Sequence, residues 1–126
     1  MLAKLLIAAF ASVALAAPAV ERAACATRCA TQCYWQSDID EAVAQGYSLL
    51  QSGEVAGNYP HQYNDFEGFQ FPTDGPWYEF PILNTFHVYT GGPPGADRVI
   101  FDGDGNFDSV ITHQGASGNN FVLCHL

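Results

Sequence analysis

The stretch SDIDEAVAQGYSLL, Ser37 to Leu50, decides the fold class because it carries the clearest helical pattern in the chain. Ser37 is suited to cap the amino-terminal end, acidic residues fill the first turn where the helix dipole favours them, and Gly53 follows the last turn. Apolar side chains recur at helical spacing and form one stripe, which we expect to face the core: Ile39, Val43, Tyr47 and Leu50.

After Gly57 the pattern changes to that of strands. Short runs rich in aromatic and β-branched residues are separated by Gly, Pro, Asn and Asp. The predicted strands are Tyr78–Leu83, Phe86–Tyr89, Arg98–Phe101 and Phe107–His113. One helix followed by hairpin-linked strands predicts an α+β fold, in which a single helix in the amino-terminal half packs on a curved antiparallel sheet.

The acidic, Gly-rich segment 102–108 has acids at alternate positions, as a calcium-binding loop does. Such a loop needs Gly where Phe107 stands and a bidentate Glu where His113 stands. A turn between two strands is therefore predicted there, and no metal site.

The amino terminus has the pattern of a secretory signal peptide. Lys4 supplies an early positive charge, residues 5–15 are apolar, and Ala14-Leu-Ala16 is a small-residue cleavage site. The apolar run is shorter than the ~20 residues needed to span a bilayer. We therefore predict a secreted, extracellular protein with no membrane association in its mature form. Its predicted parts are a signal peptide at 1–17, a short prosegment at 18–22 and one domain at 23–126.

All four cysteines lie in the predicted domain, at positions 25, 29, 33 and 124. An even number of cysteines in a short secreted chain indicates two disulfides, with three pairings possible from the sequence. The C-x₃-C-x₃-C spacing is not the paired C-x₂-C spacing typical of zinc sites, so disulfides are favoured over a metal.

The charge balance restricts the kind of partner. The chain has 4 basic and 13 acidic residues, for a net charge of −9. Removal of residues 1–22 takes away two basic residues and one acid, so two cations, Arg28 and Arg98, face twelve acids at a net charge of −10. Nucleic acids are normally bound by clusters of Lys and Arg. Any polyanion must therefore be bound locally, by a few side chains.

Four polar side chains occur in strand-like or aromatic segments: His61, Glu79, Arg98 and His113. Taken singly, each residue has a structural interpretation. A histidine can be a hydrogen-bonded part of a sheet, and Glu79 can be the solvent-facing position of a strand. Arg98 can pair weakly with Asp97 or neighbouring acids at the surface. Together, an acid, two imidazoles and a guanidinium are the groups that phosphodiester transfer needs: they move two protons and stabilise the phosphoryl charge.

These residues belong to longer motifs: YPH at 59–61, YEFPIL at 78–83, GADRV at 95–99 and ITHQGASGNNF at 111–121. In sequence, order and spacing the motifs resemble those of the guanyl-specific secreted fungal ribonucleases, and the resemblance covers the chain from about Cys25 to Cys124. The loop before Tyr59 is slightly shorter than in the best-known member of that family.

The resemblance implies a function and its catalytic residues. The function is endonucleolytic cleavage of single-stranded RNA 3′ of guanosine, through a 2′,3′-cyclic phosphate that water then opens to a 3′-phosphate, without any cofactor or metal. Glu79 is the implied general base on the 2′-hydroxyl, His61 supports it, and His113 is the implied general acid. Further roles are implied for Tyr59 and Arg98 at the phosphate oxygens and for Phe121 as an apolar wall.

The resemblance also implies a base-recognition loop at 63–67. Tyr63 and Phe66 enclose the guanine between their rings, as unpaired bases often are, and Glu67 accepts two of its hydrogen bonds. Backbone groups contact the edge of the base: the amides of Asn64 and Asp65 and the carbonyl of Asn119. Two positions depart from the family pattern, with Asp65 in place of Asn and Phe66 in place of Tyr.

In this family the first cysteine pairs with the third and the second with the last, which implies Cys25–Cys33 and Cys29–Cys124. The bonds before Pro60 and Pro76 are implied to be cis. We expect a monomer. A weakly active or inactive ribonuclease-like effector that binds RNA or a protein is the alternative, and the basic, Lys-rich ribosome-directed toxins of the same fold are excluded by the acidic composition.

Overall fold

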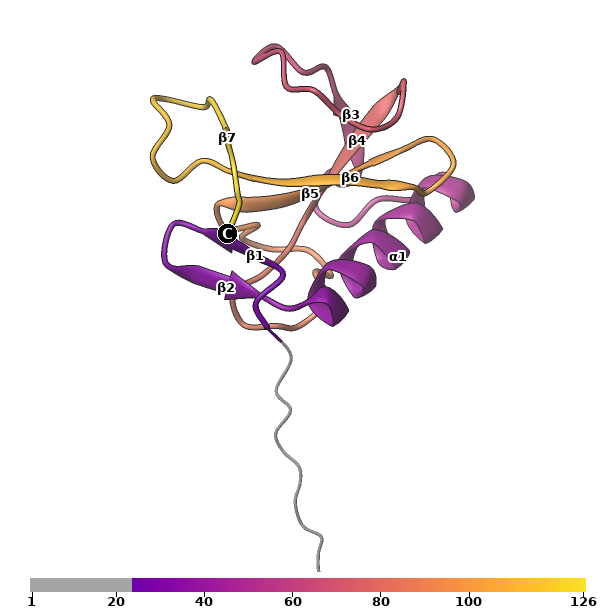
Figure 1. Cartoon of the computed structure of the whole chain (residues 1–126). Coiled ribbons are helices and arrows are strands. Elements are labelled where there is room, and N and C mark those ends of the chain that lie inside the picture. Colours follow the sequence, from indigo (N-terminus) through magenta and orange to yellow (C-terminus); the bar gives the residue numbers. More distant parts are fainter. Residues whose placement is uncertain (1–23) are drawn as a thin grey trace, which may run out of the picture.

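The computed structural model describes residues 24–126 (Figure 1). The predicted signal peptide, the predicted prosegment and Ala23 lie outside the described residues. The elements in chain order are β1 (Thr27–Cys29), β2 (Gln32–Tyr34), α1 (Gln36–Ser52), β3 (His61–Tyr63), β4 (Trp77–Pro81), β5 (Asp97–Asp102), β6 (Phe107–Thr112) and β7 (Val122–Leu123).

The five strands β3 to β7 form one antiparallel sheet in the order β3-β4-β5-β6-β7, so each strand pairs with its neighbour in the chain. β1 and β2 form a separate hairpin. The helix α1 runs along one side of the sheet and contacts β4 and β5 (Figure 1). The predicted α+β fold, with one helix on an antiparallel sheet, is confirmed.

The helix begins earlier than the sequence pattern predicts. Trp35 is the N-cap, and its backbone N–H donates to the side chain of Asp38 at 2.8 Å. Ser37 is therefore an exposed residue of the first turn and not the cap. A carboxylate three positions after the N-cap can satisfy the free N–H of the cap residue, which replaces the predicted serine cap. Gly53 ends the helix in the left-handed conformation, as predicted.

The core lies between α1 and one face of the sheet. Ile39 is buried as predicted, whereas Val43, Tyr47 and Leu50 are only partly buried at its edge. The helix approaches the sheet most closely at Gly46, where an added Cβ would lie 2.8 Å from the ring of Phe101. The predicted stripe missed this point because a glycine carries no apolar signal.

Three predicted strands are confirmed within two residues at each end, and one is wrong. Residues 86–89 are not a strand. Phe86 has a φ of 65°, in the left-handed region, and this conformation interrupts an extended run despite the favourable composition. The ring of Phe86 instead packs edge-on against Trp35. The predicted turn between β5 and β6 is confirmed, and Asp102 accepts hydrogen bonds from the amides of Asp104 and Asn106 in it.

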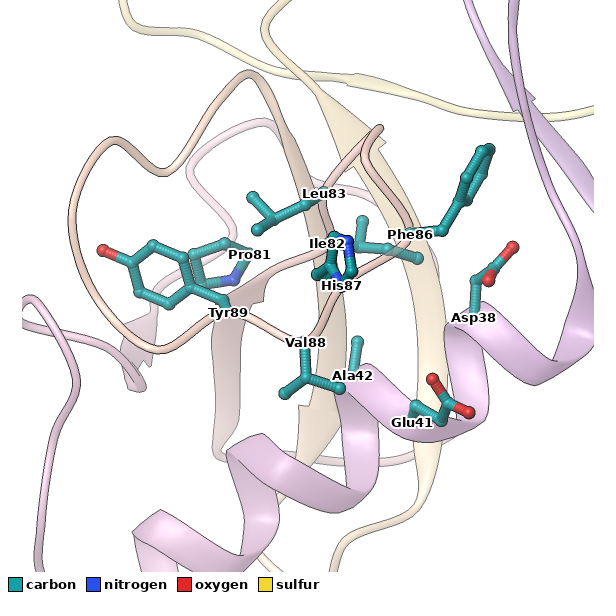
Figure 2. A pocket seen from close by; sticks show the side chains of 10 residues that line it. All are labelled: Asp38, Glu41, Ala42, Pro81, Ile82, Leu83, Phe86, His87, Val88 and Tyr89. Atoms are coloured by element: carbon teal, nitrogen blue, oxygen red, sulfur yellow. The ribbon is translucent and has the colours of Figure 1, made fainter.

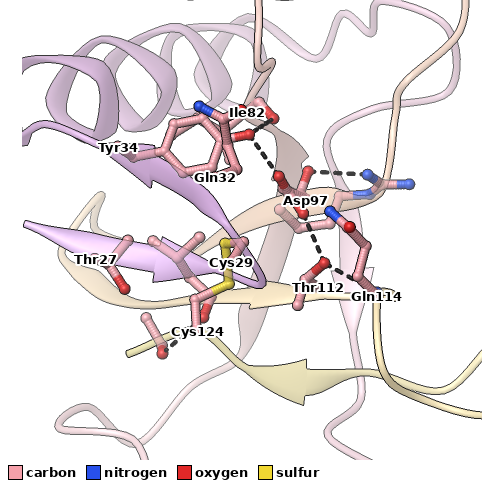
Figure 3. Close-up of a disulfide and its surroundings, with 12 residues drawn as sticks. Thr27, Cys29, Gln32, Tyr34, Ile82, Asp97, Thr112, Gln114 and Cys124 are labelled. Atoms are coloured by element: carbon pink, nitrogen blue, oxygen red, sulfur yellow. Dashed lines mark hydrogen bonds between the residues drawn. A yellow bond between two sulfur atoms is a disulfide. The ribbon is translucent and has the colours of Figure 1, made fainter. Parts of the chain in front are cut away.

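Two disulfides hold the ends of the domain. Cys25 bonds to Cys33 across the β1–β2 hairpin, and Cys29 bonds to Cys124 over a separation of 95 residues, which ties the hairpin to the carboxyl-terminal segment (Figure 3). Both implied pairings are present. On the chain-entropy estimate, the Cys29–Cys124 disulfide, with its separation of 95 residues, stabilises the fold by about 4–5 kcal/mol. The bonds before Pro60 and Pro76 are cis, as implied.

A buried carboxylate joins the hairpin to the sheet. Asp97 accepts hydrogen bonds from the Tyr34 hydroxyl at 2.5 Å and the Thr112 hydroxyl at 2.6 Å (Figure 3). Burial, together with the hydrogen bond to this carboxylate, raises the pKa of Tyr34 far above its usual range. Because the Asp97 side chain is occupied here, the suggested surface ion pair between Asp97 and Arg98 is wrong.

Candidate active site

The face of the sheet opposite α1 carries the polar residues. Side chains alternate between the two faces along a strand, and directly paired residues share a face. His61 pairs with Glu79 across β3 and β4, and Arg98 pairs with Ile111 across β5 and β6. His113 follows two residues after Ile111. Four residues distant in the sequence are therefore brought to one face by the strand register.

Glu79 lies at the centre of this group and is 7% exposed, so it is not the solvent-facing position that an isolated strand would allow. Its Oε1 lies 2.9 Å from Nε2 of His61, and its Oε2 accepts a hydrogen bond from Nε of Arg98 at 3.2 Å. A buried carboxylate needs such partners to remain charged. The ion pair with Arg98 and the contact with His61 thus hold an ionised carboxylate at the surface of the sheet.

Two contacts hold the ring of His61, one at its edge and one at its face. Its Nδ1 lies 3.1 Å from the carbonyl oxygen of Asn58, and its ring stacks on that of Tyr59 at 4.7 Å between centroids. The side chain is 47% exposed, so the ring is supported by protein and open to a ligand.

Arg98 is buried, and nearly all of its donors are used inside the protein. Nε donates to Glu79, and one Nη2 hydrogen goes to the hydroxyl of Tyr59 at 3.1 Å. The Nη1 hydrogens face backbone carbonyls at 2.9–3.4 Å, those of Pro94, Gly95 and Asp97. One of the five guanidinium hydrogens is left for a ligand. Because the Tyr59 oxygen accepts from a cation, its own proton is the better donor to an anion.

His113 lies in the loop after β6. Its Nδ1 lies 2.8 Å from the carbonyl oxygen of Asn120, which assigns the Nδ1 proton to that bond and leaves Nε2 for chemistry. The ring stacks closely on Phe121, with centroids 3.9 Å apart and an angle of 23° between the planes. Phe121 therefore fixes the plane of the imidazole.

A cleft of about 290 Å³ opens beside Glu79. It is lined by Gln62, Tyr63, Asn64, Phe66, Glu67, Glu79, Asn119, Asn120 and Phe121. The ring of Phe66 is 91% exposed and both of its faces are accessible, whereas Tyr63 is buried in a cluster with Ile100 and Ile111. The cleft has the size and the aromatic lining of a site for a planar ligand.

Glu67 is one of the residues that line this cleft. Burial would raise the pKa of its carboxyl, but hydrogen bonds from the Tyr63 hydroxyl at 2.6 Å and the Phe121 amide at 3.0 Å outweigh it and hold the pKa below its ordinary value. Burial, followed by the hydrogen bond to Glu67, raises the pKa of Tyr63 far above its usual range. Glu67 is thus an anion whose two oxygens are already oriented.

The hollow between α1 and the segment 81–89 is not a competing site (Figure 2). Asp38 and Glu41 reach it from the helix and His87 from the loop, but its volume is about 10 Å³, room for one water molecule. In residues 24–126 no cluster of three or more His, Cys, Asp or Glu is arranged to hold a metal ion. No helix in that part of the chain is long and apolar enough to cross a membrane.

Comparison with known proteins agrees with this geometry. A sequence profile described as ribonuclease matches residues 22–125. This chain belongs to the ribonuclease family. It is 60% identical over 104 residues to guanyl-specific ribonuclease N1 of Neurospora crassa, a match that covers 81% of this chain and 68% of that protein. It is 56% identical to guanyl-specific ribonuclease Ms of Aspergillus phoenicis, which covers 79% of this chain and 95% of the relative.

Among solved structures, a ribonuclease from Hericium erinaceus is similar, with a TM-score of 0.60 and 41% identity over 81% of this chain and 98% of that one. Membership of the family makes this protein an RNA-cleaving enzyme, so RNA is its substrate. The acidic composition is consistent with this site, because Glu79 is paired with one buried arginine, Arg98, and not with a cluster of basic residues.

The residues singled out from the sequence gather in one region of the structure. Of the predicted base-loop residues, all but Asp65 line the cleft, together with Asn119. His61, Arg98 and Tyr59 lie around Glu79. His113 stacks on Phe121, which also lines the cleft. Sequence reasoning missed the carbonyls of Asn58 and Asn120, which orient the two histidines. A backbone carbonyl is present in every residue, so no residue type could have indicated them.

Proposed function

We propose that this ribonuclease is a secreted enzyme that cleaves single-stranded RNA 3′ of guanosine. The observation that carries the proposal is the carboxylate of Glu79, held between His61 and Arg98 beside an aromatic cleft that a second carboxylate, Glu67, also lines. The names of the relatives support the base preference, since those reported above are guanyl-specific ribonucleases.

In the first step the 2′-hydroxyl attacks the adjacent phosphorus. Glu79 takes the proton of this hydroxyl, and the 2′-oxygen–phosphorus bond forms as the phosphorus–5′-oxygen bond breaks. His113 donates the Nε2 proton to the departing 5′-oxygen. His61, Arg98 and Tyr59 face the phosphate and stabilise the charge that develops on its oxygens. The product is a 2′,3′-cyclic phosphate.

In the second step water opens the ring, with the roles of the two groups reversed. His113, now neutral at Nε2, takes a proton from the water, and the protonated Glu79 returns one to the 2′-oxygen. The result is a 3′-phosphate. Phe121 keeps the imidazole of His113 in the same plane through both steps, because the two rings are stacked.

Base selection is assigned to the cleft. A guanine between Tyr63 and Phe66 would present N1–H and N2–H to Glu67, whose carboxylate has lone pairs beyond those already used by Tyr63 and Phe121. Adenine lacks that pair of donors. The amides of Asn64 and Asp65 and the carbonyl of Asn119 contact the remaining edge of the base.

Secretion and the mature start belong to the same proposal. An extracellular guanyl-specific ribonuclease of Gibberella baccata is 48% identical over 101 residues, which supports an extracellular location. We propose a signal peptide at 1–17, a prosegment at 18–22 and a monomeric mature domain. Mass spectrometry of the protein from culture medium should give a mature chain that begins near residue 23, and light scattering should give the mass of one chain.

The test of the function is digestion of a defined single-stranded RNA with the purified protein, followed by mapping of the ends. Early products should carry 2′,3′-cyclic phosphate and late products 3′-phosphate, all after guanosine. Tight RNA binding without cleavage would instead favour the inactive effector, and cleavage after all four bases would leave the chemistry in place but remove the assigned role of the cleft.

A further inference from the structure

The loop before Tyr59 closes as a two-residue turn. The amide of Ala56 donates to the carbonyl of Tyr59 at 2.7 Å, and the amide of Tyr59 donates to the carbonyl of Ala56 at 2.8 Å. Gly57 and Asn58 between them both have positive φ, of 50° and 76°. This combination is that of a tight hairpin turn, in which Gly and Asn are the favoured residues.

Each of the two central residues is constrained. A Cβ on Gly57 would overlap the hydroxyl oxygen of Tyr89, so the position needs glycine for space as well as for conformation. Asn58 is exposed and adopts a left-handed conformation that β-branched residues strongly disfavour. The direction of its carbonyl is therefore set by the turn and not by its side chain.

That carbonyl is the acceptor that faces Nδ1 of His61, at 3.1 Å, while Nε2 of the same ring faces Oε1 of Glu79 at 2.9 Å. A backbone carbonyl only accepts hydrogen bonds, so Nδ1 is the donor in the first contact. The turn thus defines the orientation of the imidazole and directs Nε2 toward Glu79.

We propose that the Gly57–Asn58 turn is a positioning element of the reaction: through the Asn58 carbonyl it orients the ring of His61 toward Glu79. The expected change in kcat rests on the proposed function, whereas the orientation of the His61 ring does not. Asn58 itself touches neither base nor phosphate, so its effect must pass through His61.

The test is a double-mutant cycle with Asn58→Val and His61→Ala, because a β-branched residue disfavours the left-handed turn. Asn58→Val alone should lower kcat on a GpN dinucleotide by about tenfold with KM changed by less than about twofold. In the His61→Ala background the same substitution should change kcat by less than about twofold. An equal loss in both backgrounds would overturn the proposal.

Two controls separate the turn from general strain. Asn58→Gly keeps the left-handed conformation and should stay within a few-fold of the parent. Ala30→Val places the same kind of side chain at another exposed position of positive φ, 57°, in the turn between β1 and β2. It should lower stability without lowering kcat per folded molecule. A loss with Asn58→Gly as large as with Asn58→Val would contradict the proposal.

A direct measurement does not depend on activity. The ¹⁵N and ¹H NMR signals of the His61 ring should show a slowly exchanging Nδ1–H in the parent and in Asn58→Gly, and rapid exchange of that proton in Asn58→Val. If the parent fails to cleave RNA but gives these signals, the proposed function is wrong and the positioning holds. Rapid exchange of the Nδ1 proton in the parent, or slow exchange in Asn58→Val, would overturn the positioning proposal.

Discussion

The two faces of the central sheet are built from the same strands but obey different rules. On the side of α1, β4 and β5 present Phe80, Val99 and Phe101, which are fully buried and apolar. The residues that directly precede Phe80 and Val99 in these strands, Glu79 and Arg98, lie on the opposite side of the sheet, and they are also buried but charged.

The difference lies in what each face needs in order to be stable. The apolar face is held by close packing, so it depends on shape and volume. The charged face is held by matched hydrogen bonds, with each charge of Glu79 and Arg98 paired inside the protein. Substitutions on the first face should therefore change stability, and substitutions around the second should change activity.

The largest expected effect is on the charged side. His113→Ala should lower kcat/KM on RNA by about 10²–10⁴-fold, because in the proposed mechanism His113 alone supplies the leaving-group proton. Glu79→Ala should lose less, since His61 lies 2.9 Å from the Glu79 carboxylate and can take over part of its role. Dinucleotide cleavage assays, with circular dichroism to verify folding, measure both losses.

A second, smaller effect tests the apolar side. Gly46→Ala should reduce the free energy of unfolding by about 1–3 kcal/mol, because the added methyl group would collide with Phe101 and Phe80. Urea unfolding measures it. Ser48→Ala, on the exposed side of the same helix, is the matched control and should leave stability within about 0.5 kcal/mol. Activity per folded molecule should be unchanged in both; a tenfold loss of kcat in Gly46→Ala would show that the two faces are not independent.

The third prediction separates base selection from chemistry within the charged side. Glu67→Ala should reduce the preference for GpN over ApN by about ten- to a hundredfold, since a charge-assisted hydrogen bond contributes about 1.5–3 kcal/mol. Phe66→Ala should weaken stacking on every base and change the preference less. The comparison is of kcat/KM for both dinucleotides in the parent and the two variants. An equal loss on both substrates in Glu67→Ala would make Glu67 structural.

The smallest effect is the pH dependence that Glu67 adds to stability. Its pKa in the folded state lies below the ordinary value of 4.5, so its contribution is fully present above that value and is lost as the pH falls through the lowered folded pKa. The difference in unfolding free energy between the parent and Glu67→Gln should be largest above pH 4.5 and shrink below it. Urea titrations at several pH values measure it, and a difference that grows on acidification would reverse the assigned sign.

Much of the site could be predicted from the sequence because its chemistry depends on residue type. Carboxylate, imidazole and guanidinium groups are visible in the letters, and the motifs that hold them gave the family before any geometry was known. The helix and three of the strands were predicted by periodicity and composition. Errors arose where local pattern and tertiary contacts disagree, as at Phe86, whose packing against Trp35 accompanies a left-handed backbone.

The sequence by itself determined the α+β class, the cysteine content, the acidic character and the kinds of side chain available for catalysis. These follow from local periodicity and from chemical identity, which the chain carries at every position. Only the tertiary structure decided that Asp97 binds Tyr34 and Thr112 while Arg98 binds Glu79, and that the carbonyls of Asn58 and Asn120 orient the two histidines. The pairings of Asp97 and Arg98 depend on strand register, which brings together residues far apart in the chain. The two carbonyl contacts are local, and they depend on loop conformations that residue type does not specify.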